Sequence, residues 1–421
     1  MRSLALPVAL VYVLALAGLL TLSGALLALA IVPAVFVAAA LLRAPTQPQL
    51  QVTRTLSADR IAPDDPLTVQ LVIQNQGDRI AELTLEDSVP PGLELSDGSS
   101  QVMLALEAGA TATLRYRLHG RRGFYQFGAV TATARDPLGL LVQRVHCEAP
   151  ARLMVLPEVV RLAQINIRPR RTRIYAGMIP ARQDGAGIDF LGVRAYQAGD
   201  TTRRLNARAM ARSAEGLFVN EFEQERVADI GIILDARARS DVRTAAGALF
   251  EHSVGAVAAL ALALLERGNR VGMLIYGHAV EWTLPGYGRL QRERILRALA
   301  RATTGDRAAL ESLDEMPLQL FPARSQLVVI SPLLGDDAAP IVRLRARGYQ
   351  VLVISPDPIA YEEPLIDDNT ATRLAVRVAR LERNLLIRRL RQSGIMVVEW
   401  NTSMPFAQVA AVAFGRYRGA V

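Results

Sequence analysis

The sequence predicts a mixed α/β protein with an N-terminal transmembrane helical hairpin, a β-sandwich domain and a doubly wound α/β domain. Three observations predict this class: a long opening run without charge, a region of alternating apolar and polar residues, and short apolar strands that alternate with helical segments. The boundaries that we expect are 1–43 for the hairpin, 50–156 for the sandwich, 157–227 for an arginine-rich connector and 228–421 for the α/β domain.

The N-terminal run contains no charged residue between Arg2 and Arg43. One bilayer crossing takes about 20 residues, so the run is long enough for two. Small and polar residues at 21–24 suit a tight turn between one helix over 4–20 and another over 25–42. A cleaved signal peptide is the alternative, although its apolar region should be shorter.

The two flanking arginines indicate the topology of such a hairpin. Both ends lie on one side of the membrane, and the positive-inside rule places Arg2, Arg43 and everything that follows in the cytoplasm. Cys147 is the only cysteine, so no intramolecular disulfide can form. We therefore expect a multi-pass protein of the cytoplasmic (inner) membrane whose soluble domains face the cytoplasm.

Positive charge in this chain comes from arginine alone. The 421 residues carry a formal net charge of +8, and all 48 cations are arginine. Codon bias in a GC-rich genome is one explanation, and phosphate or lipid binding by clustered guanidinium groups is another. The arginines of 161–182 suit a solvated linker, with contact to anionic headgroups of the lipid bilayer as the alternative. Nucleic acid is the weakest partner, because no recognised module or aromatic interleaving accompanies them.

The region before residue 156 has the pattern of β structure. Leu67, Val69, Leu71 and Ile73 alternate with mostly polar residues, and the turn-forming residues 75–78 follow. Strands at this spacing are typical of a β-sandwich that serves as a spacer or binding module. Further alternating segments lie at 83–85, 102–106, 114–118 and 130–134.

The region after residue 228 has almost continuously apolar strands, as expected for strands covered on both faces. A glycine closely follows each expected helix, which is a common stop signal. Ligands of such folds bind at the carboxyl ends of the strands, here Asp235, Gly277, Ser331 and Ser355. The expected strands are 230–234, 271–276, 327–330, 351–354 and 396–400, and the expected helices are 244–267, 290–302, 338–347 and 370–392.

Several motifs resemble the signature of the family called domain of unknown function 58. They are 187–190, 194–200, 203–206, 211–212 and 221–226 in the connector, with 121–128 and 136–140 in the sandwich. The resemblance covers nearly the whole chain. One departure is Ala207, where the family usually has tryptophan.

The resemblance implies a von Willebrand factor A-like domain and an association with MoxR-type AAA+ ATPases. Its signature mixes opposite charges over a short stretch, which suits either an ion-paired brace or a partner-binding loop. Gly199 and Asp200 are typical of a turn, which argues against a catalytic aspartate. The family signature and partner-binding residues are Asp189, Phe190, Arg194, Tyr196, Gly199, Asp200, Arg203, Arg204 and Asn206.

Von Willebrand A domains often hold a divalent cation through Asp-x-Ser-x-Ser after the first strand. In this chain the aspartate is Asp235, but Arg237 and Arg239 replace both serines. A guanidinium group has no acceptor atom and repels a cation, although it could neutralise the aspartate. The motif therefore predicts a degenerate metal-site position without a metal.

A second metal ligand usually follows the fourth strand as an aspartate. Here Ser331 is followed by Pro332, while Asp336 and Asp337 remain nearby in the loop. The sequence thus predicts no metal and no cofactor, and that Mg²⁺ or Mn²⁺ leaves the melting temperature unchanged.

No catalytic motif stands out. The glycine pair in 285–288 suits a turn between a strand and a helix and lacks the lysine and hydroxyl residue of a nucleotide loop, and no Gly-x-Ser-x-Gly elbow is present. We therefore expect a non-enzymatic scaffold, the partner of a MoxR-type AAA+ ATPase in complex assembly or cell-envelope processes. The alternatives are a hydrolase with an unrecognised site, or a binder of anionic lipid or nucleic acid through arginine patches. The sequence leaves the client and the oligomeric state open.

Overall fold

The computed structural model contains two compact units, Met1–Leu156 and Pro157–Val421. The structure describes residues 2–42, 47–135, 141–162, 173–184, 190–212, 216–245, 247–305, 313–315, 320–335 and 337–415. Arg43, Asp189, Asp336 and the motif at 136–140 therefore lie outside the described residues.

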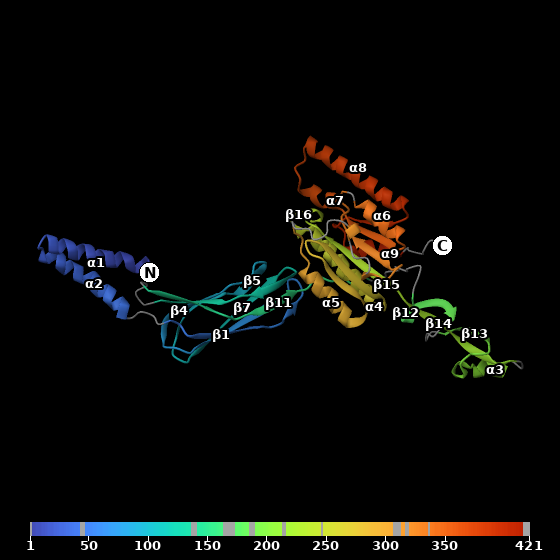
Figure 1. Ribbon diagram of the computed structural model, residues 1–421, viewed down its shortest axis with the longest axis horizontal. Helices are drawn as coiled ribbons and strands as arrows, with labels where there is room; N and C mark the ends of the chain where they lie inside the picture. The colour runs from blue at the N-terminus through green and yellow to red at the C-terminus, as the bar shows by residue number, and fades with distance from the viewer. Residues whose placement is uncertain are drawn as a thin grey trace. The chain divides into compact units, whose positions relative to one another are not determined.

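The first unit begins with the helical hairpin of α1 (Arg2–Leu20) and α2 (Gly24–Leu42), which lie side by side (Figure 1). A tight turn joins them, with Leu22 at a φ of 51°. A Cβ atom on Gly18 would lie 2.9 Å from the Leu27 side chain, so glycine allows the helices to approach closely here.

Two described helices are long and apolar enough to cross a membrane, α2 and the helix Leu249–Glu266. The second helix is 78% buried inside its own unit, which makes it a core helix. In α1, residues Ala5–Leu20 form a shorter apolar stretch. The apolar N-terminal helices therefore indicate membrane association.

The rest of the first unit is built from three sheets, ordered β1-β3-β7-β5, β10-β9-β4-β6 and β2-β11-β8. The alternation read from the sequence places Leu67, Val69, Leu71 and Ile73 fully inside, in one core cluster drawn from strands of all three sheets. The strands are β1 (Leu50–Leu56), β2 (Arg60–Ile61), β3 (Leu67–Asn75), β4 (Ile80–Asp87), β5 (Leu93–Gly98), β6 (Gln101–Leu106), β7 (Thr111–Gly120), β8 (Gly123–Phe127), β9 (Val130–Arg135), β10 (Val142–Cys147) and β11 (Ala151–Val155).

A buried ion pair lies within this β-rich core. Arg54 donates from Nε to Oδ2 of Asp87 at 3.1 Å, and its Nη2 reaches the other carboxylate oxygen. The Tyr116 hydroxyl donates to the same carboxylate at 2.5 Å. Arg54 Nη1 also donates to the carbonyl oxygen of Gly128 at 2.9 Å. The same nitrogen donates to the carbonyl oxygen of Ala149. The carboxylate and the guanidinium are thus both hydrogen-bonded from several sides, as buried charges require.

The second unit begins with strands where the sequence suggested a linker. β12 (Arg173–Asp184) and β13 (Phe190–Ala195) pair with the two sides of β14 (Phe218–Val227). Register shifts interrupt both pairings, so the period-two pattern that reveals a strand is broken in this segment. The described arginine-rich residues 173–182 therefore belong to a strand, and the solvated-linker expectation was wrong for them.

A six-stranded sheet forms the core of the second unit, in the order β19-β18-β15-β20-β21-β22. All of its neighbouring strands are parallel except β19, which runs antiparallel to β18 at the edge. Its strands are β15 (Asp229–Ala236), β18 (Arg270–Gly277), β19 (Glu281–Gly286), β20 (Gln326–Ile330), β21 (Gln350–Pro356) and β22 (Met396–Trp400).

Helices cover both faces of this sheet, with α4 and α5 on one face and α6 and α8 on the other (Figure 1). Alternate residues of each strand serve the two faces. Ile233 and Val329, for example, pack with α6 and α8 residues. The helices are α4 (Leu249–Glu266), α5 (Gly288–Arg301), α6 (Ala338–Ala346), α7 (Pro358–Glu362), α8 (Thr370–Gln392) and α9 (Phe406–Gly415).

Two local expectations differ from the structure. A helix was expected from residue 244, but β16 (Arg243–Thr244) and β17 (Gly247–Ala248) form a small hairpin there, and Gly247 has a φ of 136° that ends any helical path. Residues 285–286 were expected in a turn, but they complete the edge strand β19. Proline in a sequence usually indicates a turn, but edge strands tolerate it. Pro285 therefore led to a turn being expected where the edge strand continues.

A histidine that is partly desolvated by neighbouring aromatic rings gives the second unit a pH dependence. His252 of α4 packs edge-on against Tyr361 and Trp400, with ring centroids 5.6 and 6.2 Å away. Burial lowers the pKa of His252 below its ordinary 6.5. The unfolded chain therefore binds a proton more readily than the folded chain.

We expect the stability of the second unit to hold above pH 6.5 and to fall as pH decreases from 6.5 through the lowered pKa of His252. Thermal melts across this range should show a smaller acid loss for His252→Phe than for the wild type. An identical pH profile for the two proteins would show that His252 titrates normally in the folded chain.

Candidate functional site

The strongest candidate site lies at the carboxyl ends of the neighbouring strands β15 and β20. The chain leaves β15 toward β18 on one side and later returns to β20 on the other, so the site is the switch point where ligands of such sheets bind. Asp235 is the second-last residue of β15, and Ser331 directly follows β20. Both side chains are buried.

Arg237 occupies the centre of this site. Its guanidinium donates to both carboxylate oxygens of Asp235, from Nε at 2.9 Å and from Nη2 at 2.6 Å. It also donates to both oxygens of Asp337, from Nη1 at 2.9 Å and from Nη2 at 2.8 Å. Only 4% of the Arg237 side chain is exposed. One arginine thus joins two buried carboxylates that lie 102 positions apart in the sequence.

Further donors complete the site. The hydroxyls of Ser240 and Ser331 donate to Oδ2 of Asp235 at 2.7 and 2.8 Å. The backbone N–H of Leu334 donates to Oδ2 of Asp337 at 3.1 Å, and Arg239 reaches Oδ1 of the same carboxylate at 3.3 Å. Because the carboxylates are held on several sides, the loops after β15 and β20 are fixed against each other.

The electrostatic balance of the site favours the charged arginine. Burial alone lowers the pKa of Arg237, but the hydrogen bonds that it donates to Asp235 and Asp337 outweigh burial and raise this pKa above its ordinary value. The ring of Tyr276 lies 5.1 Å from the guanidinium carbon. Burial, followed by the charge of Asp235, raises the pKa of the Tyr276 hydroxyl well above 10, so it stays protonated.

These residues do not fit a divalent cation. The four carboxylate oxygens that could ligate it already accept hydrogen bonds from Arg237, and a positive group lies between them. Among the described residues, no group of three or more His, Cys, Asp or Glu side chains could hold a metal ion. We therefore assign no metal-dependent step to this site.

The family signature forms a second cluster around the turn after β13. Arg194 donates from Nη1 and Nη2 to the two oxygens of Asp200 at 2.6 and 2.7 Å, and its Nε lies 3.0 Å from Oε1 of Glu221 on β14. The N–H of Gln197 also donates to Asp200 at 2.8 Å. The turn requires Gly199, whose φ is 110°. Arg194 and Asp200 therefore brace this turn against the sheet.

Other signature residues have different environments. Asn206 caps the short helix α3 (Ala207–Arg212) by accepting from the N–H of Ala209 at 2.9 Å, and it donates to Asn220 at 2.7 Å. Phe190, Tyr196 and Arg203 are exposed, and Arg204 is partly buried. The structure therefore separates the predicted residues into two clusters, one around Arg194 and one around Asp235.

The Arg194 brace makes a measurable prediction. The hydrogen bond from Arg194, then that from the Gln197 N–H, lowers the pKa of Asp200 to about 2. Replacing Arg194 by glutamine removes the larger cause, so the pKa of Asp200 should rise toward its ordinary 3.8. Carboxyl-detected NMR titration measures it directly. An unchanged pKa in Arg194→Gln would mean that the ion pair does not form in solution.

Sequence reasoning missed two participants in the Asp235 site. Ser240 lies one position beyond the end of the expected Asp-x-Ser-x-Ser pattern, so its hydroxyl reaches Asp235 from outside the motif. Tyr276 comes from the buried strand β18, where nothing in an apolar run signals a polar role. Asp337 was noted only as a nearby acid, although it is half of the pair that holds Arg237.

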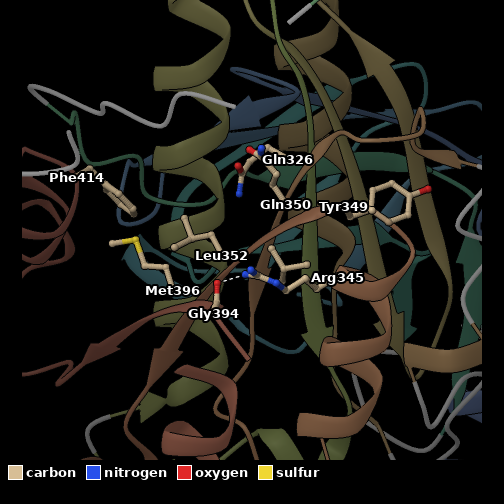
Figure 2. A pocket seen from close by; sticks show the side chains of 10 residues that line it. Gln326, Arg345, Tyr349, Gln350, Leu352, Gly394, Met396 and Phe414 are labelled. Carbon is tan, nitrogen blue, oxygen red and sulfur yellow. Dashed lines mark hydrogen bonds between the residues drawn. The ribbon is translucent and has the colours of Figure 1, made fainter. Parts of the chain in front are cut away.

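Two cavities lie away from Asp235, whose surroundings are filled by the side chains that contact it. One cavity of about 300 Å³ opens at the other end of the sheet, near the amino ends of β20 and β21, where Arg345 donates to the carbonyl of Gly394 (Figure 2). Gln326, Gln350, Met396 and Phe414 also line it. Another of about 410 Å³ lies between α7, α8 and the loop after β20.

Comparison with known proteins gives relatives without an assigned activity. The chain is 29% identical over 201 residues to uncharacterized proteins of Mycobacterium tuberculosis and Mycobacterium bovis, covering 46% of this chain and 62% of each relative. The chain thus spans less than two thirds of the length of these curated relatives.

Similar solved structures cover only about a quarter of the chain. A CARDB domain from Pyrococcus furiosus, in complex with di-metal ions, is 13% identical over 27% of this chain and 92% of that one, with a TM-score of 0.18. A FixG-related protein from Vibrio parahaemolyticus is 10% identical over 25% of this chain and 95% of that one, with a TM-score of 0.18. Scores this low carry no information on fold or function.

The match to a protein family covers the region that carries both clusters. Residues 192–366 match the family described as "Protein of unknown function DUF58". This span includes Arg194 and Asp200 as well as Asp235, Arg237 and Asp337. Residues 192–366 of this chain are therefore similar to the DUF58 family.

Proposed function

We propose that this chain is a membrane-anchored, non-enzymatic interaction protein and a partner of a MoxR-type AAA+ ATPase in complex assembly or cell-envelope processes. Its second unit is then a von Willebrand A-like domain, and its β-rich part is a sandwich that acts as a spacer. The hairpin of α1 and α2 crosses the cytoplasmic membrane twice, and the β-rich part and the second unit face the cytoplasm.

The observation that carries this proposal is the position of Arg237 between Asp235 and Asp337. In a von Willebrand A domain with a metal, the cation accepts an acidic side chain of the partner. Here an internal guanidinium replaces the cation and joins the same loops permanently. Such a site is suited to holding a surface in one shape rather than to chemistry.

One positively charged side chain of the site, Arg239, stays exposed to solvent and is available to a partner. The Arg239 side chain is 53% exposed while it contacts Asp337 at 3.3 Å. Its guanidinium can therefore form an ion pair with an acidic residue of the ATPase without breaking the internal network. Exposed ion pairs of this kind affect association rate and specificity more than stability.

Binding of the ATPase to the full-length chain in lipid nanodiscs tests the proposal. We expect a dissociation constant on the order of micromolar between the chain and the MoxR-type ATPase of the same organism. Arg239→Glu should weaken it several-fold, whereas Arg297→Glu, an exposed arginine on α5, should leave it unchanged. Failure to bind in any nucleotide state would contradict the proposed partner.

A further inference from the structure

Helix α8 carries apolar residues on two opposite faces. Its inner face buries Ile387 and Leu390 against the sheet, in the core cluster shared with α6. Its outer face leaves four large aliphatic side chains in solvent, which is unusual for a helix already packed on one side. These are Leu374, 61% exposed, Val378, 47%, Leu381, 64%, and Leu385, 53%.

The outer residues form a narrow seam. Their spacing is four, three and four positions, and at about 100° per residue they lie within an arc of about 60°. This arc is centred nearly opposite the face that contains Ile387 and Leu390. A strict a/d stripe of this width is the seam of a coiled coil, whereas helices that lie in a membrane surface have a broader apolar face that includes aromatic residues.

The charge on α8 favours an acidic occupant. The helix contains seven arginines and one glutamate, which gives a net charge of +6. Four of its arginines already pair inside the chain, Arg373 with Asp368, Arg380 with Glu363, Arg383 with Asp357 and Arg391 with Glu399. A second copy of the same helix would therefore meet a seam with like charge.

The arginines that border the seam have no such partner. Arg377, Arg388 and Arg389 form no ion pair within the described part of the chain, and all three are exposed. In coiled-coil notation Val378 occupies an a position, Arg377 the g position before it, and Arg389 an e position, where charge selects the partner. A complementary helix would carry glutamates at its own e and g positions, opposite these arginines.

We infer that the outer face of α8 binds an amphipathic, acidic α-helix of another protein, with Leu374, Val378, Leu381 and Leu385 as the apolar seam. This surface is separate from the Asp235 site and does not depend on the proposed ATPase partner. A small seam of four residues suits a reversible complex rather than an obligate one.

A designed peptide of about four heptads, with leucine at a and d and glutamate at e and g, tests this inference against the full chain in neutral nanodiscs. Fluorescence anisotropy should give a dissociation constant on the order of micromolar that weakens with added salt. Leu381→Asp should weaken binding by about tenfold or more. Leu365→Asp, an exposed leucine outside the seam, is the matched control and should bind normally.

Reversal of charge gives the sharpest outcome. The same peptide with lysine in place of glutamate should bind the wild type at least about tenfold more weakly. The Arg377→Glu and Arg389→Glu double variant should exchange these preferences. Equal binding of both peptides, or no binding of the acidic one, would overturn the inference.

Two further measurements separate other occupants. Anionic nanodisc lipid should not prevent peptide binding. If it does, and Leu381→Asp removes that competition, the seam belongs to the membrane surface and the inference is wrong. Dimerisation of the wild-type chain that Leu381→Asp abolishes in sedimentation would instead assign the seam to a second copy.

Discussion

Replacing Arg237 by serine should destabilise the second unit by about 3–5 kcal/mol in the absence of divalent cations. The substitution leaves Asp235 and Asp337 buried with their shared cation removed, and only 0% and 5% of those side chains are exposed. Two like charges then remain with only the partly exposed Arg239 beside Asp337 to offset them. Hydrogen–deuterium exchange in β15 and β20, followed alongside thermal melting, measures the loss where it arises.

The same change should create a response to metal. In the Arg237→Ser and Arg239→Ser double variant the Asp-x-Ser-x-Ser pattern is restored, and hydroxyls of Ser240 and Ser331 already point to Asp235. Millimolar Mg²⁺ should therefore recover part of the lost stability, by about 2.7 kcal/mol at a hundredfold excess over the dissociation constant. Addition of Asp235→Asn should abolish the recovery.

The wild type is the decisive control for this prediction. Because Arg237 already lies between the two carboxylates, Mg²⁺ or Mn²⁺ should not shift its melting temperature. A saturable stabilisation of the wild type by millimolar metal would mean that the cation displaces the guanidinium. The interpretation of the site as an internally closed one would then fail.

Much of the architecture could be predicted because its elements depend on local pattern. The apolar strands of the second unit and the helix over 370–392 follow from periodicity and glycine stops, and their structural bounds differ by at most two residues for the strands. Elements with an interrupted pattern escaped prediction. β12 and β13 contain register shifts, and β19 contains Pro285.

The site was predictable only in part, for a different reason. Asp235, Arg237 and Arg239 lie within five consecutive residues. The sequence alone therefore shows that arginine replaces serine at position 237 of the motif. The partner carboxylate of Asp337 comes from a distant loop, and no local pattern specifies which of several acids a folded chain brings together. The seam on α8 was not predicted from the sequence, because only burial shows which of the helix's apolar residues stay outside the packed face.

The second large effect is expected in the first unit, where Arg54→Met should cost about 3–5 kcal/mol. It would leave the Asp87 carboxylate, 0% exposed, with the Tyr116 hydroxyl as its remaining side-chain donor. Chemical denaturation of the full chain in detergent, followed by exchange in β1 and β4, measures the change. The exposed pair Arg79–Glu107 in the same unit is the matched control, and Arg79→Met should cost less than about 1 kcal/mol.

The double variant Arg54→Met and Asp87→Leu separates two reasons for this cost. If the penalty arises from an uncompensated buried charge, removing both charges should cost much less than the sum of the single losses. If instead the pair itself contributes the stability, the losses should add. We expect the first outcome, because the alternation of β1 and β4 places both side chains on core-facing positions beside Val52 and Leu85, where apolar groups also fit. Additive losses would show that the carbonyl bonds of Arg54 to Gly128 and Ala149 organise this core beyond charge balance.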